Sequence, residues 1–149
     1  MATGFADGCF TENKLKFPCY GFMNIIQIDH RKIVSKQTPF KVIEVSPWQM
    51  GFTSYLSLPI NENVIWKFQF RFQNEELSVS GVIREQRTLE NGYAYIVEWL
   101  EEDIFAGVIV QQTIRSRENR IALAFEKAVR GYVNSVMNTA AAKRFDVSC

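Results

Sequence analysis

Two lysines near the start of the chain and a polar segment further on carry the side chains most suited to binding a ligand. Lys14 and Lys16 place two ammonium groups close together, and such groups attract phosphates and other anions. Glu44 and Ser46 end an apolar stretch before Pro47, and their oxygens can accept hydrogen bonds. Together these side chains could bind an anionic ligand, with the lysines attracting its charge and the oxygens accepting its hydrogen bonds. The alternative is that Glu44 and Ser46 only end a strand and that the lysines are solvated.

Catalysis finds no support in the sequence. The one histidine, His30, stands in a polar segment typical of a hairpin turn, where histidine is usually solvated. No nucleophile elbow, P-loop, zinc-binding histidine pair or dinucleotide fingerprint is present. The three cysteines lack paired spacing and predict free thiols in a reducing compartment: Cys9, Cys19 and Cys149. We therefore expect neither an enzyme nor a metal site.

Length, composition and charge limit the class of protein. With 149 residues, 47% hydrophobic and 22% charged, the chain should form one folded domain. The net charge of +1 argues against a broad phosphate-binding face, and so against a nucleic acid polymer as partner. The longest apolar run, Ile104–Val110, is too short to span a membrane, and the beginning of the chain does not resemble a signal peptide. We expect a cytoplasmic protein.

The middle of the chain has the period-two pattern of β-strands. Val64–Phe72 alternates large apolar residues with polar ones, as a half-buried strand does. Leu77–Glu85 and Tyr93–Trp99 alternate in the same way, and the Asn91-Gly92 pair between them is typical of a tight hairpin turn. These segments predict three consecutive antiparallel strands.

Three earlier segments are less regular but apolar enough for strands: Phe22–Ile28, Phe40–Val45 and Met50–Leu56. Gly81, inside one of the later strands, indicates a bulge or a close backbone approach. Six short strands separated by turns favour a barrel or a sandwich.

After Leu100 the pattern becomes helical. Glu101, Glu102 and Asp103 place negative charge where a helix dipole favours it. The apolar residues that follow recur at helical spacing, as one helix or as two joined near Ser116. A continuous helix to about Arg144 would exceed the diameter of a small domain, so part of its apolar stripe would face a partner or a second copy. The residues expected at that surface are Ile121, Phe125, Val129, Tyr132 and Val136.

The segment Val42–Phe52 resembles the signature of PilZ domains, which bind cyclic di-GMP. That signature has an acidic residue or Asn, a Ser two positions later and a Gly three positions after that. Glu44, Ser46 and Gln49 occupy these positions here. The resemblance covers about residues 16–115 and implies a six-stranded barrel followed by a helix. The flanking segments that carry it are Met50-Gly51-Phe52, Leu56-Ser57-Leu58-Pro59, Val79–Ile83 and Tyr93–Trp99.

The chain departs from this pattern at the positions that contact the nucleotide. Gln49 replaces the glycine, whose lack of a Cβ permits positive φ and close approach. The family also has two arginines four positions apart before the first strand, and here Glu12 and Lys16 stand at those places. Lysine lacks the planar fork that pairs with phosphate, and a glutamate repels phosphate. The resemblance therefore implies a degenerate nucleotide site.

The function expected from this resemblance is a non-catalytic bacterial signalling adaptor in a cyclic di-GMP pathway, acting by protein–protein interaction. The first alternative is a genuine cyclic di-GMP receptor, with a modified site formed by Lys14, Lys16, Glu44, Ser46 and Gln49. The second is an oligomerisation module without a cofactor. Trp48 could bind a base or a partner protein if it lies at a loop tip, or could cap the barrel.

The expected organisation has three parts. Residues 1–16 form a flexible lead-in, residues 17–100 a mostly-β, PilZ-like barrel, and residues 101–144 a C-terminal helical segment.

Overall fold

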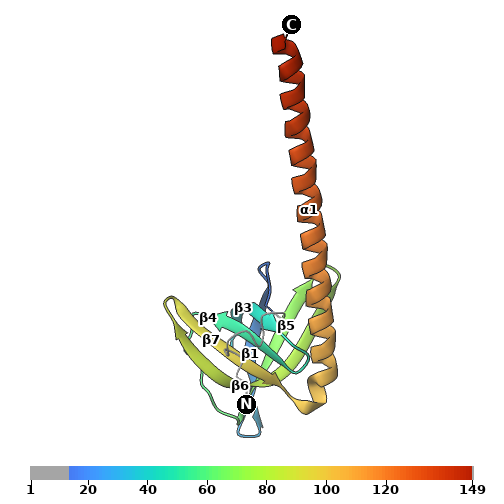
Figure 1. The fold of residues 1–149 in the computed structure, drawn as a ribbon. Coiled ribbons are helices and arrows are strands. Elements are labelled where there is room, and N and C mark those ends of the chain that lie inside the picture. Colours follow the sequence, from blue (N-terminus) through green and yellow to red (C-terminus); the bar gives the residue numbers. More distant parts are fainter. Residues whose placement is uncertain (1–13, 149) are drawn as a thin grey trace. The chain divides into compact units, whose positions relative to one another are not determined.

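The computed structural model describes residues 14–148, with side chains described as far as Asn138. Cys9, Glu12, Cys149 and most of the lead-in expected over residues 1–16 lie outside this range. The described chain forms a β-barrel and a C-terminal α-helix (Figure 1). The strands are β1 (Tyr20–Ile28), β2 (Arg31–Lys32), β3 (Thr38–Val45), β4 (Gln49–Ser54), β5 (Val64–Phe72), β6 (Glu75–Leu89) and β7 (Gly92–Trp99).

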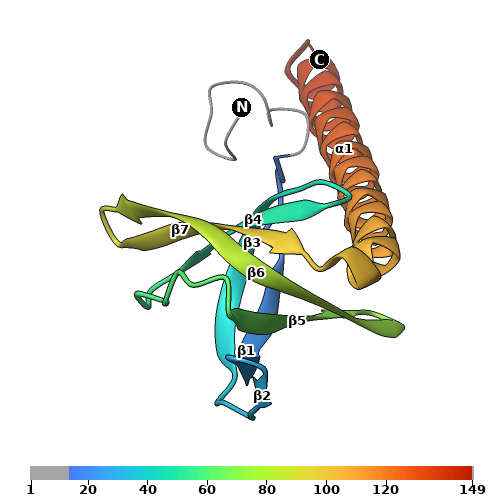
Figure 2. The ribbon, with the colours of Figure 1, turned by 90° about the horizontal axis from the view of Figure 1, so that it is seen from below.

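The sheet closes on itself. Its strand order is β2-β1-β3-β4-β7-β6-β5, every pairing is antiparallel, and an additional pairing of β1 with β5 completes a six-stranded barrel (Figure 2). The short β2 continues β1 through a turn at Asp29 and His30, whose φ angles are 48° and 68°. His30 is exposed in this turn, as its polar neighbours indicated. The predicted six-stranded barrel followed by a C-terminal helix is confirmed.

Aromatic residues fill the barrel. Phe40 lies edge-on to Phe52, Phe68 and Phe70, with ring centroids 5.4–5.7 Å apart. These four side chains are buried because alternate positions of each strand point inward. The alternation predicted for Val64–Phe72 is therefore confirmed in β5. Edge-on aromatic packing of this kind adds to the hydrophobic stabilisation of the core.

Gly81 marks a close approach between strands. A Cβ at this position would lie 2.6 Å from the carbonyl oxygen of Glu98. The irregularity between β6 and β7 lies further along, between Ile83 and Glu85. Of the two alternatives predicted for Gly81, the close backbone approach is the one observed.

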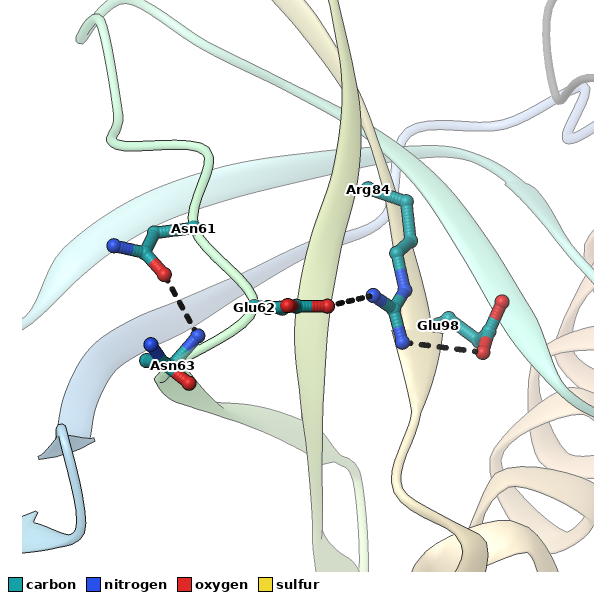
Figure 3. A network of polar contacts seen from close by, with 5 residues as sticks. All are labelled: Asn61, Glu62, Asn63, Arg84 and Glu98. Carbon is teal, nitrogen blue, oxygen red and sulfur yellow. Dashed lines mark hydrogen bonds and ion pairs between the residues drawn. The ribbon is translucent and has the colours of Figure 1, made fainter.

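A polar network on the barrel surface links β6, β7 and the loop before β5 (Figure 3). The Arg84 guanidinium lies 3.9 Å from a carboxylate oxygen of Glu62 and 3.6 Å from one of Glu98. Asn61 accepts a hydrogen bond from the backbone N–H of Asn63 at 2.8 Å. Because these groups are largely exposed, their ion pairs contribute little to stability.

The C-terminal segment is one helix, which resolves the alternative of two helices joined near Ser116. A 3₁₀ turn, Glu101–Asp103, leads into α1, Ile104–Ser148, which has 45 residues. Asp103 accepts a hydrogen bond from the backbone N–H of Ser80 at 2.8 Å. The chain divides into two compact units, the first ending at Ile114 and the second beginning at Arg115.

The beginning of α1 belongs to the core of the first unit. Val110 and Ile114 are fully buried there with the barrel residues. A Cβ at Gly107 would lie 2.5 Å from the Trp99 ring and 2.6 Å from the carbonyl oxygen of Pro47, so only glycine fits at this point of contact. Within the described residues, no helix combines the length and the apolar character needed to cross a membrane.

Candidate ligand-binding site

The predicted site lies where β3 turns into β4. The segment before β1 runs beside β3, with the Leu15 N–H donating to the Ile43 carbonyl at 2.9 Å and the Val42 N–H donating to the Cys19 carbonyl at 2.8 Å. Lys14 pairs with Glu44 in an isolated antiparallel bridge. The fold therefore brings Lys14 and Glu44 together, as the proposed site requires.

Glu44 points into the protein. Only 4% of this residue is exposed, and its carboxyl group lies against Gly51, where a Cβ would be 2.8 Å from Cγ and 3.0 Å from Oε1 of Glu44. Its Oε2 atom has no hydrogen-bond partner within the described part of the chain. The period-two pattern of β3 did not indicate this burial, because the register between β3 and β4 shifts between Val42 and Glu44 and the adjacent Val45 is buried too.

The surroundings of Glu44 favour its neutral form. Burial of the carboxyl group raises the pKa of Glu44 from 4.5 to about 7, because water no longer solvates the charge. The positive charge of Lys14 opposes this rise. Near neutral pH the side chain is therefore divided between a carboxylate and a carboxylic acid that can donate a hydrogen bond.

The Ser46 side chain forms its hydrogen bonds within the turn between β3 and β4. Its backbone N–H donates to the Gln49 carbonyl at 2.9 Å, and its hydroxyl donates to the same carbonyl at 3.2 Å. The hydroxyl also accepts from the Gln49 N–H at 3.3 Å. Only 2% of Ser46 is exposed. These contacts occupy the hydroxyl that the signature would offer to a nucleotide.

Gln49 fits this turn without strain. Among the described residues other than glycine, only Asp29 and His30 have positive φ. Gln49 begins β4 and pairs with Glu98, so its backbone is extended. The turn between β3 and β4 therefore does not need the conformational freedom that glycine gives the family signature.

Replacing Ser46 with alanine should lower the free energy of unfolding by about 1 kcal/mol, because the turn loses both hydroxyl hydrogen bonds. Urea unfolding followed by tryptophan fluorescence measures this change. Ser78→Ala, at an exposed position of β6, is the matched control and should leave stability nearly unchanged. Equal effects of the two substitutions would contradict the structural role of Ser46.

The other predicted residues lie on the surface. Lys14 and Lys16 are exposed, and Trp48 is more than half exposed at the turn between β3 and β4. The backbone carbonyl of Trp48 accepts a hydrogen bond from the Trp99 N–H at 2.9 Å, which fixes the turn while its ring is open to solvent. The predicted helix residues lie in the second unit, where Phe125, Val129, Tyr132 and Val136 are exposed and Ile121 is half-buried.

A hollow of about 490 Å³ in the first unit escaped the sequence reasoning. Tyrosine side chains and one lysine contribute to its lining, which comes from β1, β3, the end of β4 and the turn between β6 and β7. No local pattern in the sequence indicates this hollow, because its lining residues come from segments far apart in the chain. Its lining includes Tyr20, Lys41, Tyr55 and Tyr93.

Comparison with solved structures shows a likeness of fold. No family model matches the chain, and no curated protein matches it. The search of solved structures finds the PilZ domain of YcgR from Escherichia coli, described with c-di-GMP. The likeness has a TM-score of 0.49 and 12% sequence identity, and it covers 74% of this chain and 95% of that domain. The present chain is thus similar to a PilZ domain and has the barrel and helix that the sequence resemblance predicted.

Proposed function

We propose that this chain is a non-catalytic signalling adaptor in a cyclic di-GMP pathway, with a degenerate nucleotide site, and that it acts by binding another protein. The observation that carries the proposal is the burial of both polar side chains at the signature positions. Glu44 faces Gly51 inside the fold, and the Ser46 hydroxyl bonds within its own turn. A nucleotide would have to displace these contacts before it could use either group.

The charges near the turn also support a weak site. A buried carboxylate disfavours a phosphate, and Lys14, which could attract one, already lies beside Glu44. Lysine provides a point charge without the bidentate fork of arginine. The attraction left for an anionic ligand is therefore the weak kind that exposed lysines provide.

Titration calorimetry of the whole protein with cyclic di-GMP at near-physiological salt tests the proposal. We expect no heat of binding up to hundreds of micromolar nucleotide. A dissociation constant at or below low micromolar would contradict the adaptor proposal and favour the receptor.

A second candidate, a cyclic di-GMP receptor with a modified site, is favoured by the exposure of Lys14 and Lys16 beside the turn. If heat is observed, the double substitution Lys14→Ala with Lys16→Ala should abolish it. Lys32→Ala with Lys36→Ala removes the same charge from exposed positions elsewhere and serves as the control. Equal losses from both pairs would indicate non-specific attraction of the nucleotide.

A further inference from the structure

The hollow in the first unit lies where the pairing between β3 and β4 stops. β3 begins at Thr38, but the ladder between the two strands begins only at Lys41, which pairs with Thr53. β4 ends one residue later, at Ser54, which pairs with Tyr93 of β7. The first three residues of β3 therefore have no partner in this ladder, and two of them line the hollow.

The turn between β6 and β7 forms a second wall of the hollow and lies against the end of β4. Glu90, Asn91 and Gly92 of this turn line the hollow. Gly92 has a φ of 149°, and a Cβ there would lie 2.8 Å from the carbonyl oxygen of Ser54. Only glycine permits this backbone conformation and this close approach. Backbone contacts therefore hold the hollow open in the absence of a ligand.

Aromatic side chains line the hollow at two depths. Phe40 is 2% exposed, and Tyr93 is half-buried, with its ring centroid 6.3 Å from that of Tyr95. Tyr20 and Tyr55 are 62% and 85% exposed. Such rings pack favourably against another planar ring, either stacked or edge-on. The volume of the hollow, about 490 Å³, is in the range of pockets that bind small molecules.

Three hydrogen-bond donors lie next to one another along one wall. Tyr20 of β1 is directly opposite Lys41 of β3, and Lys41 is directly opposite Thr53 of β4. Residues paired in this way have Cβ atoms about 4.5–5.5 Å apart on the same face of the sheet. All three line the hollow. The Lys41 ammonium and the two hydroxyls can therefore donate hydrogen bonds to one anionic group of a ligand.

An acidic residue, Glu90, also lines the hollow, but on the other side of β4. In the strand order β3-β4-β7, β4 separates the strand of Lys41 from the hairpin that carries Glu90. Neighbouring strands are about 4.8 Å apart, so the backbones at these two residues are separated by roughly 10 Å. Salt screens exposed charges over a similar distance. The charge closest to the three donors is therefore positive.

We infer that the hollow binds a small aromatic carboxylate, with its planar ring against the aromatic side chains and its carboxylate at Lys41. The ladder between β3 and β4 runs from Lys41, at the hollow, to Val45, at the turn that resembles the PilZ signature. The hollow is thus at the opposite end of this ladder from that turn, and the inference goes beyond the proposed adaptor role.

Titration of the isotope-labelled full chain with three indoles, followed by NMR, tests the inference. Indole-3-acetate, indole-3-acetamide and tryptamine share one ring and carry a negative, a neutral and a positive side group. We expect indole-3-acetate to bind with a dissociation constant of about 1 mM or below, which is reasonable for a ligand of this size. It should shift the amide signals of Lys41, Thr53 and Gly92. The other two should bind about 10-fold more weakly, because the charge-assisted hydrogen bond is lost.

Substitutions at exposed positions separate the contribution of the charge from that of the rings. Lys41→Met should weaken binding of indole-3-acetate about 10-fold and leave binding of the amide unchanged. Lys32→Met removes the same charge from an exposed position of β2 and is the control. Tyr20→Ala should weaken all three ligands, because ring contacts are lost. Tyr132→Ala, at an exposed tyrosine of α1, is its control and should weaken none.

Four results would overturn the inference. The first is an absence of shifts at ligand concentrations about 10-fold above the expected dissociation constant. The second is equal affinity for the three indoles, and the third is an equal loss from the two lysine substitutions. The fourth is a set of shifts confined to Ser46 and Gln49, which would place the ligand at the signature turn. Calorimetry with cyclic di-GMP is a separate measurement, so neither result decides the other.

Discussion

Replacing Glu44 with glutamine should raise the free energy of unfolding at about pH 8 by about 3 kcal/mol. Burial raises the pKa of Glu44 to about 7 in the folded protein, against an ordinary value of 4.5. Between these values the folded state binds more protons than the unfolded state, so wild-type stability falls as pH rises. The loss begins near pH 4.5 and is complete above about pH 7. A pKa difference of this size between the folded and unfolded states corresponds to about 3 kcal/mol. Glutamine does not titrate and avoids this loss.

Urea unfolding of both proteins across that pH range measures the effect. Glu90→Gln, in the exposed turn between β6 and β7, is the control and should leave the pH dependence of stability unchanged. Lys14→Ala should shift the pKa of Glu44 further upward, because the charge that opposes the rise is removed. Wild-type stability that does not fall between about pH 5 and 8 would show that Glu44 is not buried as described.

Replacing Phe40 with alanine should lower the free energy of unfolding by about 3–5 kcal/mol, the range for removing a buried phenylalanine. The ring touches three other aromatic rings from two further strands, Phe52 of β4 and Phe68 and Phe70 of β5. Little of the vacated space can be filled, because the surrounding rings are held in a closed sheet. Chemical unfolding followed by tryptophan fluorescence measures the loss.

Phe22→Ala provides the comparison for this substitution. Phe22 lies in β1 but is more than half exposed, so the same change of side chain removes little buried area. Its effect should stay within about 1 kcal/mol of zero. A Phe40→Ala protein as stable as Phe22→Ala would mean that Phe40 is not at the centre of the core.

The sequence predicted those elements whose signals are local. Alternation along Val64–Phe72, the Asn91-Gly92 pair and the acidic residues before α1 each act within a few positions, and the corresponding strand, hairpin and helix start are observed. The predicted ends of the strands were less accurate. The sequence predicted that this strand ends at Glu85, whereas β6 extends to Leu89. The end of a strand depends on its neighbour, and the turn beyond β6 gives no sign of how far the pairing runs.

The candidate site was harder to predict because its geometry depends on contacts between strands. Residues Glu44 and Ser46 were recognised as polar, but the positions of their side chains follow from Gly51 on the paired strand and from hydrogen bonds to Gln49. The register between β3 and β4 also shifts between Val42 and Glu44. Period-two reasoning within one strand cannot locate such a shift.

The closure of the sheet through β1 and β5 also bears on aggregation. Sheets with open edges expose unpaired backbone groups that recruit strands from other molecules. In the described chain each of the six barrel strands has a hydrogen-bonded neighbour on both sides. Edge-to-edge growth into fibrils is thereby suppressed while the barrel stays folded. Loss of solubility at high concentration should therefore begin at exposed apolar side chains, and the barrel strands should contribute only after unfolding.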